Sequence, residues 1–214
     1  MERKKGTIGK ILLIAVIVIV GLAAAAPYAA LDPALSRIKL DPGYPLHYPL
    51  LVVHIFTALI ALLTGPFQFS ARLRQTRMSL HRLLGKVYLA SILISSVTGL
   101  AVAFHDASFT KQMAFVTLSA LWLLTARCGY QTIRKGDVAG HRVWMMRSYG
   151  ITLVAVTARL VVPVCILFYM AAKGLPGTDG IAQMIDAILQ VNIWLGIILN
   201  MAILEWSLIR KANR

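Results

Sequence analysis

Charged residues are scarce in this chain, and acidic residues are the scarcest of all. Among the 214 residues, 14% are charged, and eight Asp and Glu stand against 22 Lys and Arg, which gives a formal net charge of +14. The hydrophobic share is 58%, whereas soluble domains have about 25% charged and about 45–50% apolar residues. This composition excludes a disordered chain, which combines high charge with few apolar residues. It also argues against an ordinary soluble globule.

Cysteines and closely spaced metal ligands are also lacking. The two cysteines, Cys128 and Cys165, lie far apart within apolar segments, so the sequence predicts neither a disulfide nor a zinc site. No two of the five histidines have the i, i+3 or i, i+4 spacing of a helix-borne metal motif. The alternation of apolar and polar residues that is typical of strands is missing as well.

Long apolar runs take up most of the chain. A membrane-spanning helix needs about 20 mostly apolar residues, and six segments of that kind follow one another. We therefore predict an all-α, polytopic membrane protein with a bundle of six transmembrane helices, at Ile11–Ala30, Tyr48–Phe69, Leu83–Phe104, Met113–Tyr130, Val143–Ala172 and Ile181–Ile209. Pro163 predicts a kink or a tilt in the fifth of them.

The connections between the apolar runs are short, and none is long enough for a second domain. We expect one integral membrane domain over residues 1–214, with a first helix or anchor at 11–30, motif-bearing helices two to five at 48–172 and a last helix at 181–209. The first segment also resembles a secretory signal peptide, because a basic region precedes an apolar run that reaches Ala24-Ala25-Ala26. The run is longer than in most signal peptides, which favours a retained anchor, and cleavage would leave five helices.

The basic residues cluster on one side of the predicted membrane. Sixteen of the 22 lie in the N-terminal segment, the second-to-third and fourth-to-fifth connections and the C-terminus. Cytoplasmic flanks of membrane helices are enriched in Lys and Arg, so the pattern predicts a multi-pass protein of the cell membrane with both termini in the cytoplasm. Topology thus accounts for the basicity, and we expect the lipid bilayer, and no nucleic acid, as partner. Arg159 lies inside the fifth predicted helix, and this rule does not explain it.

Ionisable side chains inside membrane helices are costly and usually face the bundle interior. His47 is most simply an interfacial residue, but the other four histidines fall in or at the ends of predicted helices. At about 100° per residue, Arg159 lies directly above His141, and a polar face of the third helix contains His81, Tyr88, Ser95, Thr98 and His105. The sequence thus predicts an inner layer with His81, Arg82, His141 and Arg142, and an outer layer with His54, His105 and Arg159.

Two histidines that face each other across a helix bundle can supply both axial ligands of a haem, and arginine pairs well with the haem propionates. We therefore expect haem b near each membrane face, and electron transfer that involves a quinone or a redox partner protein. The predicted cofactor-binding residues, with the histidines acting only as haem-iron ligands, are His54, His81, Arg82, His105, His141, Arg142 and Arg159. Contact with lipid headgroups is an alternative role for His81 and His141, as is a solvated helix cap for His105.

Three stretches of the sequence resemble a known family. They are His54 with Gly65-Pro66-Phe67-Gln68-Phe69, the run from His81 to Tyr88, and the run from His141 to Tyr149 followed by Arg159 and Pro163. Together they resemble bacterial predicted membrane proteins that share the domain of unknown function 2306. The resemblance covers roughly residues 48–167 and implies a multi-helix membrane bundle, without an activity that can be carried over.

A looser resemblance is to di-haem b-type membrane cytochromes, which are helical bundles with two histidine pairs. It implies His81 and His141 as the inner pair. For the outer pair it implies a partner of His54 on the fourth helix, which has no histidine, so His105 would have to substitute. Two other functions remain open, namely a transporter with an anion-binding cavity around Arg159, and a non-catalytic subunit or assembly factor of a membrane complex. The sequence assigns no catalytic residue.

Overall fold

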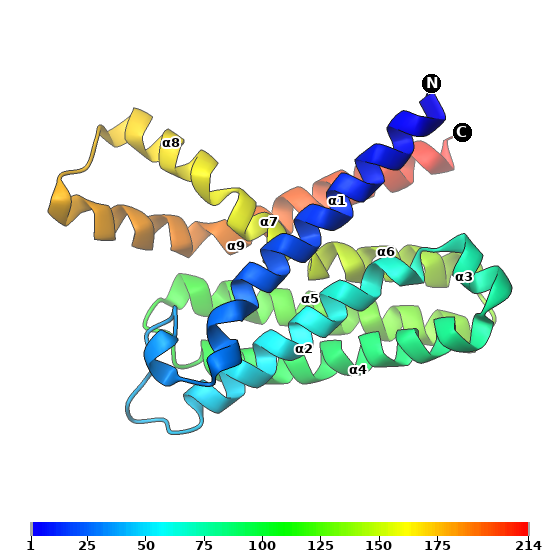
Figure 1. The fold of residues 1–214 in the computed structure, drawn as a ribbon, viewed down its shortest axis with the longest axis horizontal. Coiled ribbons are helices and arrows are strands. Elements are labelled where there is room, and N and C mark those ends of the chain that lie inside the picture. Colours follow the sequence, from blue (N-terminus) through cyan, green and yellow to red (C-terminus); the bar gives the residue numbers. More distant parts are fainter. Residues whose placement is uncertain (1, 214) are drawn as a thin grey trace. The chain divides into compact units, whose positions relative to one another are not determined.

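The computed structural model describes the backbone of residues 2–213, and it describes their side chains except those of residues 2–7, 10, 178, 179 and 212. The sequence predicts the basic N-terminal residues on the cytoplasmic side, and the side chains of these residues lie outside the described part. They are Arg3, Lys4, Lys5 and Lys10. The helices form two compact units, Met1–Thr98 (unit 1) and Gly99–Arg214 (unit 2), and each unit is described by itself (Figure 1). No β-strand occurs within residues 2–213, which confirms the predicted all-α fold.

Six helical stretches of the described chain are long and apolar enough to cross a membrane, which confirms the predicted number. Five of them agree with the predicted segments to within about five residues, and the fifth stretch begins at residue 154 instead of 143. The six stretches are Ile11–Ala30, His47–Gln68, Met78–Ala103, Phe109–Arg134, Val154–Lys173 and Gly180–Lys211.

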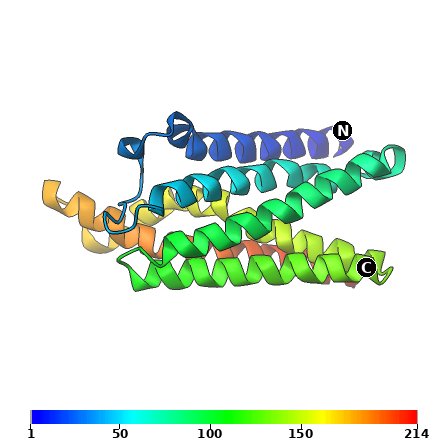
Figure 2. The same cartoon turned by 90° about the horizontal axis from the view of Figure 1, so that it is seen from below.

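The first apolar segment packs as part of unit 1. Helix α1 (Glu2–Ala25) continues into the short 3-10 helix η1 (Ala26–Ala30) and lies along α2 (His47–Gln68) (Figure 2). The helices approach closely at the buried Gly21, where an added Cβ would lie 2.7 Å from Cδ2 of Leu62. A residue larger than glycine therefore does not fit there unless Leu62 moves.

The connection between α1 and α2 is held by side chains from both of its ends. The backbone N–H of Arg37 donates to the hydroxyl of Tyr28 at 3.1 Å, and the backbone N–H of Asp41 donates to Nδ1 of His47 at 2.9 Å. His47 is 2% exposed, so it packs inside unit 1, and its position at the membrane interface stays a prediction. It lies buried because the preceding residues fold back over the start of α2.

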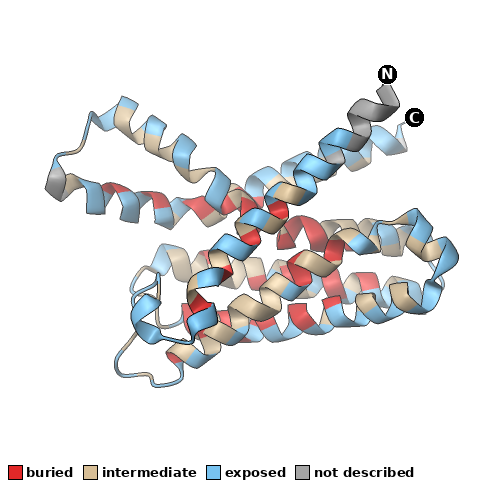
Figure 3. Cartoon of the chain, viewed as in Figure 1, coloured by how far each residue is buried: buried red, intermediate tan, exposed pale blue. Residues whose placement is uncertain are grey.

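Helix α4 (Met78–Ala103) follows α2 through the short helix α3 (Ala71–Thr76). The polar residues predicted to share one face of α4, Tyr88, Ser95 and Thr98, are all buried, as Figure 3 shows for this helix in red. His105, which was predicted at the end of the helix, lies in the turn after it, because α4 ends at Ala103.

In unit 2, α5 (Phe109–Arg134) and α6 (Val138–Thr152) form a closely packed antiparallel pair. Asp137 ends the turn between them and caps α6, since its Oδ1 accepts the backbone N–H of Gly140 at 2.8 Å. An added Cβ on the buried Gly129 would lie 2.7 Å from Sδ of Met145. Because Gly129 has no side chain, the backbone of α5 can approach α6 closely at this position.

The predicted fifth helix is three helices in the structure. Helix α6 is followed by α7 (Val154–Leu160) and α8 (Val162–Lys173), with single-residue breaks at Leu153 and Val161. Pro163 accounts for the break at Val161, because its nitrogen has no proton to donate to the carbonyl four residues earlier. The backbone N–H of Val161 still donates to the carbonyl of Thr157 at 2.9 Å, the usual helical partner, so α7 keeps its hydrogen bonds up to the break.

The break at Leu153 was not predicted, and it overturns one geometric expectation. His141 lies on α6 and Arg159 on α7, so the two residues do not belong to one regular helix. Their predicted vertical alignment, which needs a continuous helix of five whole turns, therefore no longer follows.

The last helix, α9 (Thr178–Ala212), packs against α5, α6, α7 and α8. Its buried residues recur along one side of the helix (Figure 3), at Met184, Ile188, Asn192 and Ile197. Nδ2 of Asn200 donates to the carbonyl of Gly150 at 2.9 Å, and Nδ2 of Asn192 donates to that of Ala158 at 3.2 Å. Both carbonyls lie in the turn before a break, so α9 supplies donors at the places where the regular helix is interrupted.

Candidate functional site

His54, on α2 in unit 1, is held by two contacts with Ser95 of α4. Its Nδ1 lies 2.8 Å from the backbone carbonyl oxygen of Ser95 and 3.0 Å from the Ser95 hydroxyl, which itself donates to the carbonyl of His54 at 3.1 Å. A carbonyl oxygen only accepts hydrogen bonds, so Nδ1 is the protonated nitrogen. In the neutral ring, Nε2 then has the lone pair that a metal ion needs.

His81 and Arg82 lie in the first turns of α4. His81 is half-buried and its backbone N–H donates to the carbonyl of Arg77 at 3.1 Å, whereas the side chain of Arg82 is exposed. Ser95, the partner of His54, is 14 residues further along α4, which corresponds to about 21 Å. His54 and His81 therefore lie toward opposite ends of unit 1, and unit 1 does not bring them together.

His141, in the first turn of α6 in unit 2, makes the same kind of contact as His54. Its Nδ1 lies 2.7 Å from the carbonyl oxygen of Gly129 on α5. The close approach of the two helices at Gly129 positions that carbonyl, and the Asp137 cap fixes the start of α6. Nδ1 is again the donor, and Nε2 is the nitrogen that can ligate a metal ion. Arg142, the next residue, is exposed.

His105 is half-buried in the turn between α4 and α5, and its backbone N–H donates to the carbonyl of Val102 at 3.1 Å. From the start of α5 at Phe109 to Gly129, the partner of His141, the helix rises by about 30 Å. The two histidines of unit 2 thus lie toward opposite ends of α5. Each unit has one candidate histidine near each of its ends.

Arg159 is exposed on α7, whereas the polar residues Ser148 and Thr152 of α6 are buried. A guanidinium nitrogen of Arg159 donates to the carbonyl of Ala155 one turn earlier on the same helix. At least one donor of this guanidinium is therefore engaged by its own helix.

A half-buried ion pair in unit 2 was missed by the sequence reasoning. Arg147 of α6 and Glu205 of α9 form two parallel hydrogen bonds, from Nε to Oε1 at 2.7 Å and from Nη2 to Oε2 at 3.0 Å. Glu205, one of the two acidic residues in the last apolar run, was the available signal, since such a charge needs a partner of opposite sign in a membrane helix.

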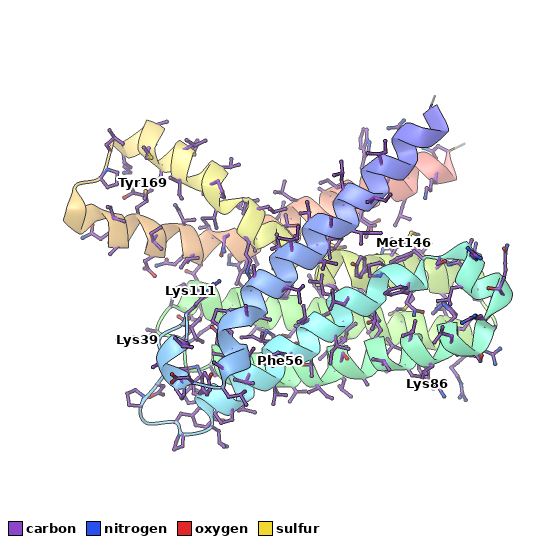
Figure 4. The ribbon with its side chains drawn as sticks, in the orientation of Figure 1. Lys39, Phe56, Lys86, Lys111, Met146 and Tyr169 are labelled. Atoms are coloured by element: carbon purple, nitrogen blue, oxygen red, sulfur yellow. The ribbon has the colours of Figure 1, made fainter. Side chains whose placement is uncertain are left out.

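Polar side chains near the start of α9 join that helix to α5. Nζ of Lys111, labelled in Figure 4, lies 3.1 Å from Oδ1 of Asp186, and Nε2 of Gln190 donates to Oδ2 of the same carboxylate at 2.8 Å. The Asp186 side chain is 59% exposed. Gln183, about one turn earlier on α9, is exposed as well, so these polar side chains lie on the surface of unit 2.

No cluster of three or more His, Cys, Asp or Glu side chains with the spacing of a metal site occurs among the described residues. The thiols of Cys128 and Cys165 are both free and half-buried. The donor set that remains for a metal ion consists of single histidines, which is the kind of set that haem iron uses.

The chain matches the model of one protein family over residues 51–206, and the family is described as predicted membrane protein (DUF2306). No curated protein and no solved structure matches the chain. The matched region contains α3 to α8 in full and most of α2 and α9, together with all seven candidate site residues. The chain therefore belongs to the predicted membrane protein family DUF2306.

Proposed function

We propose that this integral membrane protein binds haem b and transfers electrons, with His141 and His54 as haem-iron ligands through Nε2. The observation that carries the proposal is the 2.7 Å contact between Nδ1 of His141 and the carbonyl of Gly129. Histidines that ligate metal ions almost always donate their other ring N–H to a carbonyl or carboxylate, which fixes the tautomer and the ring orientation. His54 meets the same condition at Ser95.

The neighbouring cations also suit a haem. Arg142 follows His141 directly, Arg82 follows His81, and both arginine side chains are exposed. Exposed guanidinium groups can pair with the two propionates of a haem in a two-point geometry. The donor set thus contains the histidine ligands and the cations that haem b requires.

Variants must identify which residue is the second haem-iron ligand beside His141 and which is the second beside His54. The sequence predicts His81 as the partner of His141 and His105 as the partner of His54, and variants of His81 and His105 test these pairs. Haem b supplies one-electron chemistry when bound, and a quinone or a redox protein is the proposed electron partner. The protein itself orients the imidazole rings through the two carbonyl contacts and provides cations for the propionates.

The test is the visible spectrum of the full-length protein, purified from haem-replete cells and recorded in the oxidised and reduced forms. We expect a Soret band that weakens in His141→Ala and His54→Ala, and equally in His81→Ala and His105→Ala if these are the second ligands. His141→Gln, which keeps a polar side chain, should weaken the band as much as His141→Ala does, while the thermal unfolding of the protein stays near wild type.

His47→Asn is the matched control, because Oδ1 of asparagine can accept the Asp41 N–H in place of Nδ1. This variant removes a histidine that has no proposed role in haem binding, so its spectrum should equal that of the wild type. Absence of a Soret band both after purification and after haem reconstitution would contradict the proposal. An equal loss of the band in His47→Asn would contradict the assignment of the ligands.

A further inference from the structure

The connection between α2 and α4 has positive charges without acidic neighbours in the sequence. Between Asp41 and Asp106 the chain contains five Lys and Arg residues and no Asp or Glu. In unit 2, by contrast, Arg147 pairs with Glu205 and Lys111 pairs with Asp186. The charges around α3 therefore have no carboxylate in their own stretch of chain to balance them.

Helix α3 is an ordered element, and one of its arginines, Arg74, is anchored to the end of α2. The hydroxyl of Ser70 caps it by accepting the backbone N–H of Leu73 at 3.2 Å. Nη1 of Arg74 donates to the carbonyl of Gln68, at the end of α2, at 2.9 Å. The side chains of Arg72 and Arg77 are exposed on either side of this anchored residue. Lys86, labelled in Figure 4, is exposed further along α4.

Large apolar side chains flank the same arginines. Phe67 is 57% exposed, Phe69 is 40% exposed and Met78 is 45% exposed. The candidate membrane span His47–Gln68 ends just before α3, and the span Met78–Ala103 begins just after it. Helix α3 therefore lies where a bilayer meets water. A short helix with cations beside exposed aromatic residues is the usual composition of such an interface.

We propose that α3 and its flanking residues bind the headgroup phosphate of an acidic phospholipid, with Arg72 and Arg77 as the residues that recognise it. The exposed side chains of Phe67 and Met78 favour a lipid over a soluble anion, because they offer an apolar surface for the acyl chains. This inference is independent of haem binding. It leaves out Arg82, which is a candidate for contact with a propionate.

Native mass spectrometry of the full-length protein in a neutral detergent, with equal amounts of phosphatidylglycerol and phosphatidylcholine, tests the proposal. We expect phosphatidylglycerol to bind preferentially. The double variant Arg72→Gln/Arg77→Gln should lower its affinity by about fivefold for each arginine, since that is the contribution of one basic residue near an anionic lipid surface. Arg72→Lys/Arg77→Lys, which keeps both charges, should restore most of the affinity.

Arg37→Gln/Lys39→Gln is the matched control, because it removes two exposed cations from the α1–α2 connection, a stretch that also contains Asp32 and Asp41. We expect this control to bind phosphatidylglycerol as the wild type does, and both double variants to unfold at the wild-type temperature. An equal loss of affinity in the control would overturn the proposal, as would equal binding of the two lipids. Release of the lipid by excess inorganic phosphate would also overturn it, since the site would then recognise phosphate alone.

Discussion

Arg147 of α6 and Glu205 of α9 face each other in a two-point ion pair, with donor–acceptor distances of 2.7 and 3.0 Å. The guanidinium carbon of Arg147 also lies 4.7 Å from the centre of the Trp144 ring. Glu205 belongs to the last candidate membrane span, where an unpaired carboxylate is costly. The pair thus joins two helices of unit 2 at one defined position.

Glu205→Ala should lower the thermal unfolding temperature of the purified protein, followed by circular dichroism in detergent. Breaking a fully buried pair costs about 3–5 kcal/mol. The two side chains are 26% and 37% exposed, so we expect a smaller loss, of about 1–2 kcal/mol. Arg147→Lys should also destabilise, because an ammonium group cannot form the two parallel bonds.

Lys111→Ala is the control for this variant, since it breaks an ion pair whose carboxylate is 59% exposed. Exposed pairs contribute about 0–1 kcal/mol, so the control should unfold close to the wild-type temperature. A Glu205→Ala variant as stable as Lys111→Ala would show that the pair does not hold α6 on α9.

Asn200→Leu should destabilise the backbone at the Leu153 break, and Asn192→Leu should destabilise it at the Val161 break. The first variant removes the donor to Gly150 and the acceptor of the Thr157 hydroxyl, and the second removes the donor to Ala158. We expect each to cost about 1–2 kcal/mol. In hydrogen-exchange mass spectrometry, Asn200→Leu should speed exchange around Leu153, whereas Asn192→Leu should speed it around Val161. Identical exchange patterns in the two variants would contradict this assignment.

Gly129→Val should destabilise unit 2 by about 1–3 kcal/mol, the usual cost of overpacking. Its side chain would enter the space of Met145, whose Sδ lies 2.7 Å from the position of a Cβ on residue 129. Met145→Ala opens that space, so the double variant should be less destabilised than the sum of the two single variants, as judged by thermal unfolding in a double-mutant cycle. Strict additivity of the two changes would argue against the close approach of α5 and α6.

Gly21→Leu should separate α1 from α2, because its Cβ would lie 2.7 Å from Cδ2 of Leu62 and 3.2 Å from Cδ1 of Leu59. We expect a lower unfolding temperature and easier proteolysis between the two helices. Gly9→Leu on the same helix is the control, since nothing lies within 4 Å of a Cβ there. If both variants behave alike, the packing of α1 on α2 does not contribute to stability.

The membrane spans could be predicted because a long apolar run is a local property of the sequence. Twenty or so apolar residues in a row are enough to identify a membrane helix, and the buried face of α4 follows from its polar residues at helical spacing. Pro163 likewise predicted the irregularity that the structure has at Val161, because the missing N–H is a property of that residue alone.

The features that were missed depend on partners distant in sequence. Leu153 breaks the helix without a proline or glycine, and the compensating donor to Gly150 comes from Asn200, 50 residues later. His47 is buried because Asp41 folds back onto it, which its own surroundings in the sequence do not reveal. The carbonyl contacts of His54 and His141 likewise come from other helices, so the sequence could name these histidines but not the orientation of their rings.

The two breaks before and after α7 have a consequence for the order in which the protein is assembled. The chain leaves the ribosome from its N-terminus, so the carbonyls of Gly150 and Ala158 are made well before Asn200 and Asn192. Until α9 enters the bilayer, those carbonyls lack the donors that the finished fold gives them, and lipid offers no substitute. Insertion of the last helix is therefore the step that completes the hydrogen bonding at both breaks, and in a nascent chain arrested before Asn192 the carbonyls of Gly150 and Ala158 still lack these donors.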